Sequence, residues 1–384
     1  MAVPRIALPL ISDDPLHVSV TRGGAEESCH AVDVALCDAD GSVLVGLGDV
    51  ERLVFPRSAM KPLQAIALSE AWEGIDEAKR LVPAEMSLIC ASHNGQPEHV
   101  DAVRRLLDRF ELPVELLSCG PQWSGDQPTM IAQTRTIDTP GRIHNNCSGK
   151  HAGMLVLSRC IGHDPKGYAA LTHPVQQAIL GTLEAMVGID LMAHPHGLDG
   201  CGAPALSAPL GNWARAFALF AGGGALPAGR MAACTRIRQG IAAAPRMIAG
   251  DRRLCTAIGE AFGEQITAKT GAEGVFAAAF HEFGLGAMVK ARDGNSRAAG
   301  AAMVAVIHAL GYDLPEPVRA LSLPRLTNWA GDHVGDIAVG APLMAPEPVF
   351  SAEAVPGGTV TRRNHSVTQL VDRMPQNQTN IHQP

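Results

Sequence analysis

Alternating apolar and polar positions mark both ends of the chain. Residues 17–23 and 31–36 alternate with the period of two that is typical of half-buried strands, and an Asp-Gly turn follows the second segment. After residue 270, the segments 274–284 and 285–294 again predict strands. We therefore expect one lobe containing an antiparallel sheet, built from the two ends of the chain.

The middle of the chain has a helical pattern instead. Between residue 57 and about residue 262, apolar side chains recur at helical spacing, and glycine-rich turns separate the segments. The clearest predicted helices are 61–73, 99–111, 174–188 and 245–263.

These patterns predict how the chain is organised. We expect one domain, 1–345, in which a helical lobe of about 57–264 is inserted into a sheet lobe of about 14–56 and 265–345. This is an α/β layout of the α+β-like kind. From residue 346 to 384 the apolar periodicity is lost, while Asn, Gln, Pro and His become frequent. That composition predicts a poorly ordered tail.

Composition excludes several classes of function. The net charge of −7 comes from scattered charges of both signs, and aromatic residues make up only 4% of the chain, so we expect no nucleic-acid surface. The beginning of the chain has no apolar run of signal-peptide length, and the most apolar stretches elsewhere are too short or too polar to span a bilayer. The 9 cysteines never form a CxxC motif, which favours a reducing, cytoplasmic location.

The segment PRSAMKP, residues 56–62, places Ser58 three residues before Lys61 at the start of a predicted helix. Serine is a favourable N-cap residue, so Ser58 could simply begin that helix. The same spacing also puts both side chains on one helical face. A neutral lysine there could take the proton of the hydroxyl group and make Ser58 a nucleophile.

Two further segments favour the chemical interpretation. Residues 92–94 read SHN, and residues 269–271 read KTG. The patterns S-x-x-K, S-x-N and K-T-G occur in this order in serine β-lactamases and penicillin-binding proteins. We therefore predict Ser58 as nucleophile with Lys61 as its base, and Ser92 with Lys269 as a second pair that passes a proton to the leaving amine. Backbone N–H groups, including that of Ser58, would form the oxyanion hole.

Two glycine-rich segments, HNNCSGKHAG at 144–153 and GLDGCGAP at 197–204, each contain one cysteine. Cys147, Lys150 and His151 could converge with Cys201 around a metal ion such as zinc. Alternatively, Lys150 could anchor a substrate carboxylate, or both segments could be turns with buried thiols. The spacing does not choose among these. Cys255, in the predicted helix 245–263, would by pattern alone be a core thiol.

The chain also resembles the asparaginase II family of the Rhizobium etli type, the third structural class of L-asparaginases. The resemblance runs from about residue 15 to about residue 340, and HNNCSGKHAG is its most specific motif. The segments that carry it are RSAMKP, CASHNGQPEHV, HNNCSGKHAGML, GLDGCGAP, AKTGAEGV and NWAGDHVGD.

This resemblance implies a fold like that of serine β-lactamases and glutaminases, a homodimer, and hydrolysis of L-asparagine to L-aspartate and ammonia. It implies two Ser–Lys pairs, which match the pairs predicted above. It also implies a zinc site and a substrate-binding site close to the nucleophile. The matching zinc ligands are Cys147, Lys150 and Cys201, and the expected substrate-binding residues are His93, Asn94, Lys150 and Cys255.

Two alternatives stay open at this point. The same residues could serve a glutaminase or a β-lactamase-like amidohydrolase, although a cytoplasmic location disfavours cell-wall substrates. A protein of this fold could also bind an amino acid without catalysis. Such a protein often lacks a nucleophile or a base, whereas every candidate group occurs in this chain.

Overall fold

The computed structural model describes residues 2–74 and 76–344. The predicted tail, 346–384, lies outside the described residues. Among the helices that are described, none is long and apolar enough to cross a lipid bilayer.

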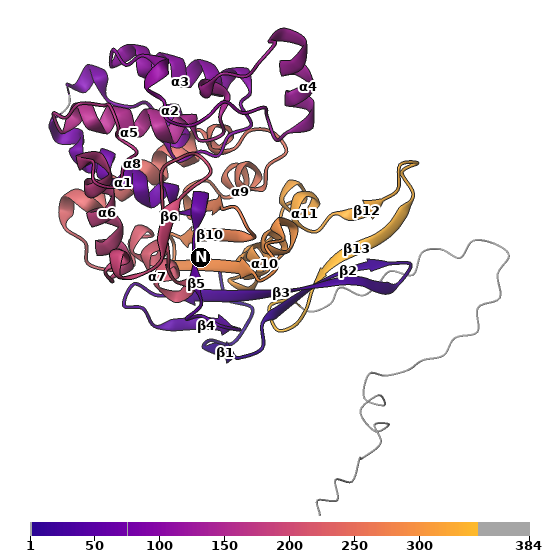
Figure 1. Ribbon diagram of the computed structural model, residues 1–384. Coiled ribbons are helices and arrows are strands. Elements are labelled where there is room, and N and C mark those ends of the chain that lie inside the picture. Colours follow the sequence, from indigo (N-terminus) through magenta and orange to yellow (C-terminus); the bar gives the residue numbers. More distant parts are fainter. Residues whose placement is uncertain (1, 75, 345–384) are drawn as a thin grey trace, which may run out of the picture. The chain divides into compact units, whose positions relative to one another are not determined.

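Both ends of the chain build a single sheet, as the alternating patterns predict (Figure 1). In the described residues the sheet has nine strands, with the order β12-β13-β2-β3-β11-β10-β9, while β4 pairs with β3 and β1 pairs with β4. The β1–β4 pairing is parallel and the other pairings are antiparallel. The strands are β1 (Leu10–Ser12), β2 (Leu16–Arg22), β3 (Ala25–Cys37), β4 (Val43–Leu47), β9 (Ile266–Thr270), β10 (Val275–Phe280), β11 (Leu285–Ala291), β12 (Arg325–Thr327) and β13 (His333–Val339).

Helices dominate the middle of the chain, and two short strand pairs lie among them. The helices are α1 (Lys61–Glu70), α2 (Pro83–Ile89), α3 (Pro97–Arg109), α4 (Gln127–Thr136), α5 (Ser148–Cys160), α6 (Pro174–Val187), α7 (Leu210–Phe220), α8 (Ala228–Ala243) and α9 (Leu254–Phe262), followed by α10 (Ser296–Ala309) and α11 (Glu316–Ser322) near the end. The strand pairs are β5 (Leu53–Val54) with β8 (Ala208–Pro209), and β6 (His196–Leu198) with β7 (Pro204–Leu206).

The helical segment is anchored on the sheet by α7. This helix contacts β3, β10 and β11. A Cβ added to Gly286 of β11 would lie 2.1 Å from the Ala214 carbonyl oxygen of α7, so the missing side chain lets helix and strand touch. The sheet lobe and the helical lobe therefore share a packed core instead of meeting only at their connections.

The predicted helix 245–263 is wrong as a single element. A 3-10 turn, Pro245–Ile248, ends before a break at 249–253, and α9 begins at Leu254. The break is conformationally specific because Gly250 has φ +101° and Arg252 has φ +57°. The residue just before the break is bonded to the SHN segment, since the Ser92 N–H donates to the Ile248 carbonyl at 3.0 Å. The apolar periodicity continues across residues that the chain uses to shape a site.

Candidate active site

Ser58 lies inside a 3-10 turn, Arg57–Met60, immediately before α1. The N-cap of this turn is Pro56, so the interpretation of Ser58 as an N-cap is wrong. The side chain is partly exposed, and its hydroxyl makes no hydrogen bond within the described residues. As the second residue of the turn, Ser58 also has a backbone N–H without an intrahelical acceptor. The Ser58 hydroxyl and the Ser58 backbone N–H thus have no hydrogen-bond partner among the described residues. A hydroxyl that attacks a substrate and an N–H that stabilises an oxyanion both need to be available in this way.

The residue before Ser58 has a strained backbone. Arg57 has φ +52°, which is uncommon for a residue with a side chain. Its guanidinium forms an ion pair with Asp199, with an Nε–Oδ1 distance of 2.5 Å. Asp199 belongs to the GLDGCGAP segment, so that segment holds the turn that presents Ser58. Strain of this kind persists where the surrounding contacts enforce it, and it is often found at functional sites.

The KTG segment at the end of β9 lies directly beside this turn. A Cβ added to Gly271 would lie 2.3 Å from the Pro56 carbonyl oxygen and 3.4 Å from the Ala59 nitrogen. A side chain at position 271 would therefore separate the edge strand from the turn that carries Ser58. Glycine is required here for close backbone approach, not for a left-handed conformation.

Lys61 begins α1, and its side chain is buried, with 1% exposed. Its Nζ donates to the Ala91 carbonyl, to Ser92 Oγ at 2.9 Å and to Cys147 Sγ at 3.1 Å. These three acceptors match the three N–H groups of an ammonium. No hydrogen bond joins Lys61 to Ser58 in the described structure, so the first predicted pair is close in sequence but not bonded.

The second predicted pair is hydrogen-bonded. Lys269 Nζ lies 2.9 Å from Ser92 Oγ and donates to the Thr270 carbonyl at 2.8 Å. Ser92 is therefore bonded to Lys61 and to Lys269 at once. Burial lowers the pKa of Lys269 to about 7, against the opposing effect of Cys255 and with the help of nearby cations. At neutral pH Lys269 can thus accept a proton, which a lysine with an ordinary pKa cannot.

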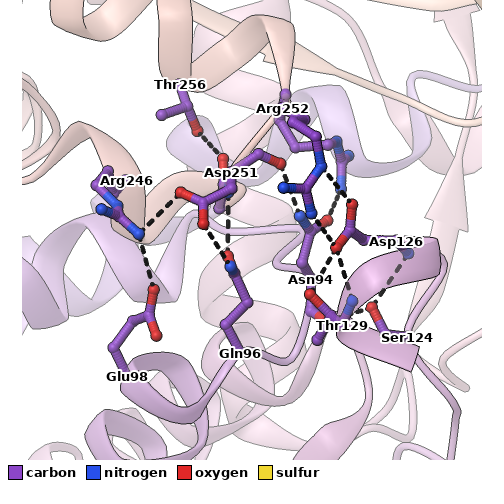
Figure 2. Close-up of polar contacts among 12 residues, drawn as sticks. Asn94, Gln96, Glu98, Ser124, Asp126, Thr129, Arg246, Asp251, Arg252 and Thr256 are labelled. Atoms are coloured by element: carbon purple, nitrogen blue, oxygen red, sulfur yellow. Dashed lines mark hydrogen bonds and ion pairs between the residues drawn. The ribbon is translucent and has the colours of Figure 1, made fainter. Parts of the chain in front are cut away.

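His93 and Asn94 are both engaged by the protein. His93 Nδ1 accepts the Gly95 N–H at 3.0 Å, and Nε2 lies 3.0 Å from Ser148 Oγ. Burial lowers the pKa of His93 well below its usual range, so the ring is neutral. Asn94 takes part in a polar network with the 249–253 break (Figure 2). Their role as substrate-binding residues stays a prediction, and in this structure they fix the SHN segment in place.

Cys147, Lys150 and Cys201 come together in the structure. Lys150 Nζ donates to Cys201 Sγ at 3.0 Å. The Cys201 thiol hydrogen-bonds the Cys147 sulfur and thereby lowers the pKa of Cys147, an effect that the charges of Lys61 and Lys150 reinforce. The same bond raises the pKa of Cys201. The charges of the two buried lysines therefore favour the deprotonated form of Cys147.

A zinc ion fits these donors under one condition. Among the described residues there is no cluster of three His, Cys, Asp or Glu side chains that could hold a metal ion. The two sulfurs with the Lys150 amine make a three-donor set suited to zinc, provided that Cys201 and Lys150 lose their protons. His151 is not part of this donor set, because its Nδ1 is hydrogen-bonded to the Tyr168 hydroxyl at 2.5 Å.

Cys255 contacts the KTG segment from α9. The Cys255 sulfur accepts the Thr270 N–H at 3.3 Å, and its thiol lies 3.5 Å from Thr270 Oγ1. It is buried, with 3% exposed, as a core thiol would be. Its predicted contact with substrate stays a prediction, while its contact with Thr270 ties α9 to the edge strand.

Sequence reasoning missed three charged residues near this site: Arg57, Asp199 and Arg253. Asp199 was visible within the GLDGCGAP motif, although nothing in the motif indicates its ion pair with Arg57. Arg253 gave no signal, because it falls in a segment whose spacing predicts an ordinary helix. Their partners are distant in sequence, and only the folded chain brings them together.

Two solved structures of β-lactamases are similar to this chain at low sequence identity. A putative β-lactamase from Bacteroides dorei is 14% identical, with 77% of this chain and 94% of that chain covered and a TM-score of 0.35. A β-lactamase from Mycobacterium bovis is 16% identical, with 73% and 95% covered and a TM-score of 0.30. At TM-scores this low the two matches carry no argument. No curated protein sequence matches this chain.

The family comparison is decisive. The model of the family described as L-asparaginase II matches residues 18–339, which is most of the chain. The predicted fold class, an antiparallel sheet flanked by helices with an inserted helical segment, agrees with this match and with the sheet order described above and is confirmed. The chain belongs to the L-asparaginase II family.

Proposed function

We propose that the protein hydrolyses the side-chain amide of L-asparagine, releasing L-aspartate and ammonia. Family membership identifies it as an amide hydrolase. The observation that carries the mechanism is the hydroxyl of Ser92, which lies 2.9 Å from the amine of Lys61 and 2.9 Å from that of Lys269. The strand β9, which carries Lys269, contacts the turn that presents the unpartnered hydroxyl of Ser58.

In the proposed reaction Ser58 Oγ attacks the amide carbonyl carbon. A C–O bond forms, the C–N bond breaks, and ammonia leaves with one added proton. The Ser58 N–H stabilises the negative charge on the carbonyl oxygen during attack. Water then cleaves the ester, which releases L-aspartate and returns the hydroxyl of Ser58.

The relay supplies a route for the protons. A proton can pass from Lys61 through the Ser92 hydroxyl to Lys269, whose pKa of about 7 makes it an acceptor at neutral pH. Lys61 then takes the proton of Ser58, and the stored proton returns through Ser92 to the departing ammonia. Because Ser58 and Lys61 are not hydrogen-bonded in this structure, the proposed proton transfer requires the two side chains to come closer.

We also propose that Cys147, Lys150 and Cys201 hold zinc. When bound, the ion would supply a fixed positive charge beside the site and help to orient the substrate. The acyl-transfer steps above use only side chains of the protein. A homodimer, implied by the resemblance, likewise stays a prediction that analytical ultracentrifugation tests.

Ammonia release by purified protein tests the proposed function. Ser58→Ala should lower kcat by about 1,000-fold or more, because the acyl-enzyme cannot form. Ser28→Ala, which alters a serine of comparable exposure in β3, is the matched control and should retain activity. Full activity in Ser58→Ala would refute the scheme.

The choice of substrate separates this proposal from its alternatives. Asparagine, glutamine and a chromogenic β-lactam, assayed side by side, distinguish an asparaginase from a glutaminase or a β-lactamase-like enzyme. A binding module would instead show thermal stabilisation by asparagine without any release of ammonia.

A further inference from the structure

Arginines near the 249–253 break differ in how their charges are balanced. Arg246 forms an ion pair with Asp251 at 2.8 Å, and Arg252 pairs with Asp126 at 2.6 Å. Figure 2 shows both pairs within one polar network. Each of these guanidinium groups is therefore neutralised by a carboxylate of the protein.

Arg253 is the exception. Its NH1 donates to Asn94 Oδ1 at 2.6 Å, and it has no carboxylate partner among the described residues. A guanidinium has five N–H donors, and a neutral amide oxygen satisfies only one of them. The side chain is half-buried, where an uncompensated positive charge is costly. Such a group is suited to receive an anion from outside the protein.

The location of Arg253 points to the active site. Its partner Asn94 follows Ser92 by two residues, and the Asn94 amide is oriented because Nδ2 donates to the Asp251 carbonyl at 2.9 Å. Arg253 also precedes α9, whose Cys255 contacts the KTG segment. Arg253 thus contacts the segment that supplies Ser92, and it directly precedes the helix whose Cys255 contacts the segment that supplies Lys269.

The effect of Arg253 on neighbouring charges agrees with this location. After burial, which is the largest cause, its positive charge is among those that lower the pKa of Lys269 and the pKa of His93. The field of Arg253 therefore reaches the proton relay.

Lys150, the other candidate for a carboxylate anchor, is already engaged by the protein. Its Nζ donates to Cys201 Sγ at 3.0 Å, and the Cys201 thiol in turn donates to Asp199 Oδ2 at 3.6 Å. Arg253, which has no such anionic partner among the described residues, is therefore the better anion receptor.

We propose that Arg253 binds the α-carboxylate of the substrate through charge-assisted hydrogen bonds and so selects amides that carry this group. This inference rests on the proposed amide hydrolysis at the same site and adds the residue that recognises the substrate. Asn94 then acts as a positioning residue for Arg253, because its amide oxygen accepts a hydrogen bond from the guanidinium.

Two substrates separate carboxylate binding from a merely structural role. 3-Aminopropanamide keeps the primary amide and the amine of asparagine but lacks the carboxylate. At a pH where Lys269 is neutral in both proteins, Arg253→Gln should lower kcat/KM for asparagine about 10- to 100-fold more than kcat/KM for 3-aminopropanamide, in line with the loss of charge-assisted hydrogen bonds. Arg253→Lys should recover part of the loss. Arg252→Gln, the control, should not change the ratio between the two substrates.

The possible outcomes are distinguishable. Equal losses on both substrates, or no loss on either, would overturn the role of Arg253 while leaving amide hydrolysis intact. If the wild-type protein hydrolyses neither substrate, the proposed function fails, and calorimetry with L-aspartate decides about Arg253. Binding of L-aspartate that Arg253→Gln abolishes would support the carboxylate site, and absence of binding to the wild-type protein would overturn it.

Discussion

Lys269 and Lys150 are both buried lysines, with 0% and 4% exposed, yet their surroundings act in opposite directions. The pKa of Lys269 is lowered to about 7 by burial, with cations nearby. The pKa of Lys150 is raised because two sulfurs and a carboxylate outweigh the effect of burial. Similar burial therefore favours the neutral amine at Lys269 and the protonated amine at Lys150, and the neighbouring charges decide which form is favoured. Zinc would have to displace the proton of Lys150 to bind there.

Lys61 connects these two regions. Its amine bonds Ser92 on the side of Lys269 and Cys147 on the side of Lys150. The site is thus divided into a region that moves protons and a region that holds charge. Three experiments test this division.

The largest effect is expected at Lys269. Lys269→Met removes the proton acceptor but keeps an unbranched buried side chain, so kcat should fall by about 100- to 10,000-fold while the fold persists. Ammonia release and the thermal midpoint measure the two effects. Lys166→Met, at an exposed lysine, is the control. Unchanged kcat in Lys269→Met would show that Ser92 does not need this partner.

The next largest effect is expected in the pH dependence, through Lys269. Because the neutral amine accepts the proton, kcat/KM should rise with pH through about 7 and be about 50-fold lower at pH 5 than at pH 7. The charged and titratable groups that act on Lys269 are Lys61, Arg253, Cys255 and Cys147. Arg253→Gln removes one cation and should therefore move the midpoint to higher pH. Activity that falls between pH 6 and 8 would contradict this assignment.

A smaller effect is expected for zinc in the region of Lys150. Added zinc should raise the thermal midpoint by a few degrees, because a ligand that binds only the folded state stabilises it. Cys201→Ser should abolish both this shift and zinc retention in dialysis. Cys234→Ser, at a buried cysteine of α8, should preserve them. A shift of equal size in Cys201→Ser would exclude the proposed ligands.

The sequence predicts the sheet well because strand alternation is a local signal. β3 and β11, which pair in the sheet, were each predicted as strands from the alternation in their own segment. The break at 249–253 was hidden, since helical spacing continues through it and Gly250 is the main local clue. Periodicity reports which faces are apolar, and it does not report where the backbone leaves the helix.

The candidate site was predicted residue by residue, but its bonding was not. The motifs identify Ser58, Lys61, Ser92 and Lys269, whereas their contacts depend on packing between segments that are distant in sequence. Spacing suggested that Lys61 would face Ser58, and the folded chain turns its amine toward Ser92 and Cys147 instead. The division into two lobes stays a prediction. The contact of α7 with the sheet adds that the helical segment packs on the strands.

The contact at Gly271 limits how this protein can be redesigned. Any residue larger than glycine would push the edge strand away from the turn of Ser58, since the added Cβ would lie 2.3 Å from a backbone oxygen. A selection for broader substrate range would therefore find little useful variation at this position. Libraries are better directed to position 253, just before α9, where the partner of Asn94 can change without moving the backbone.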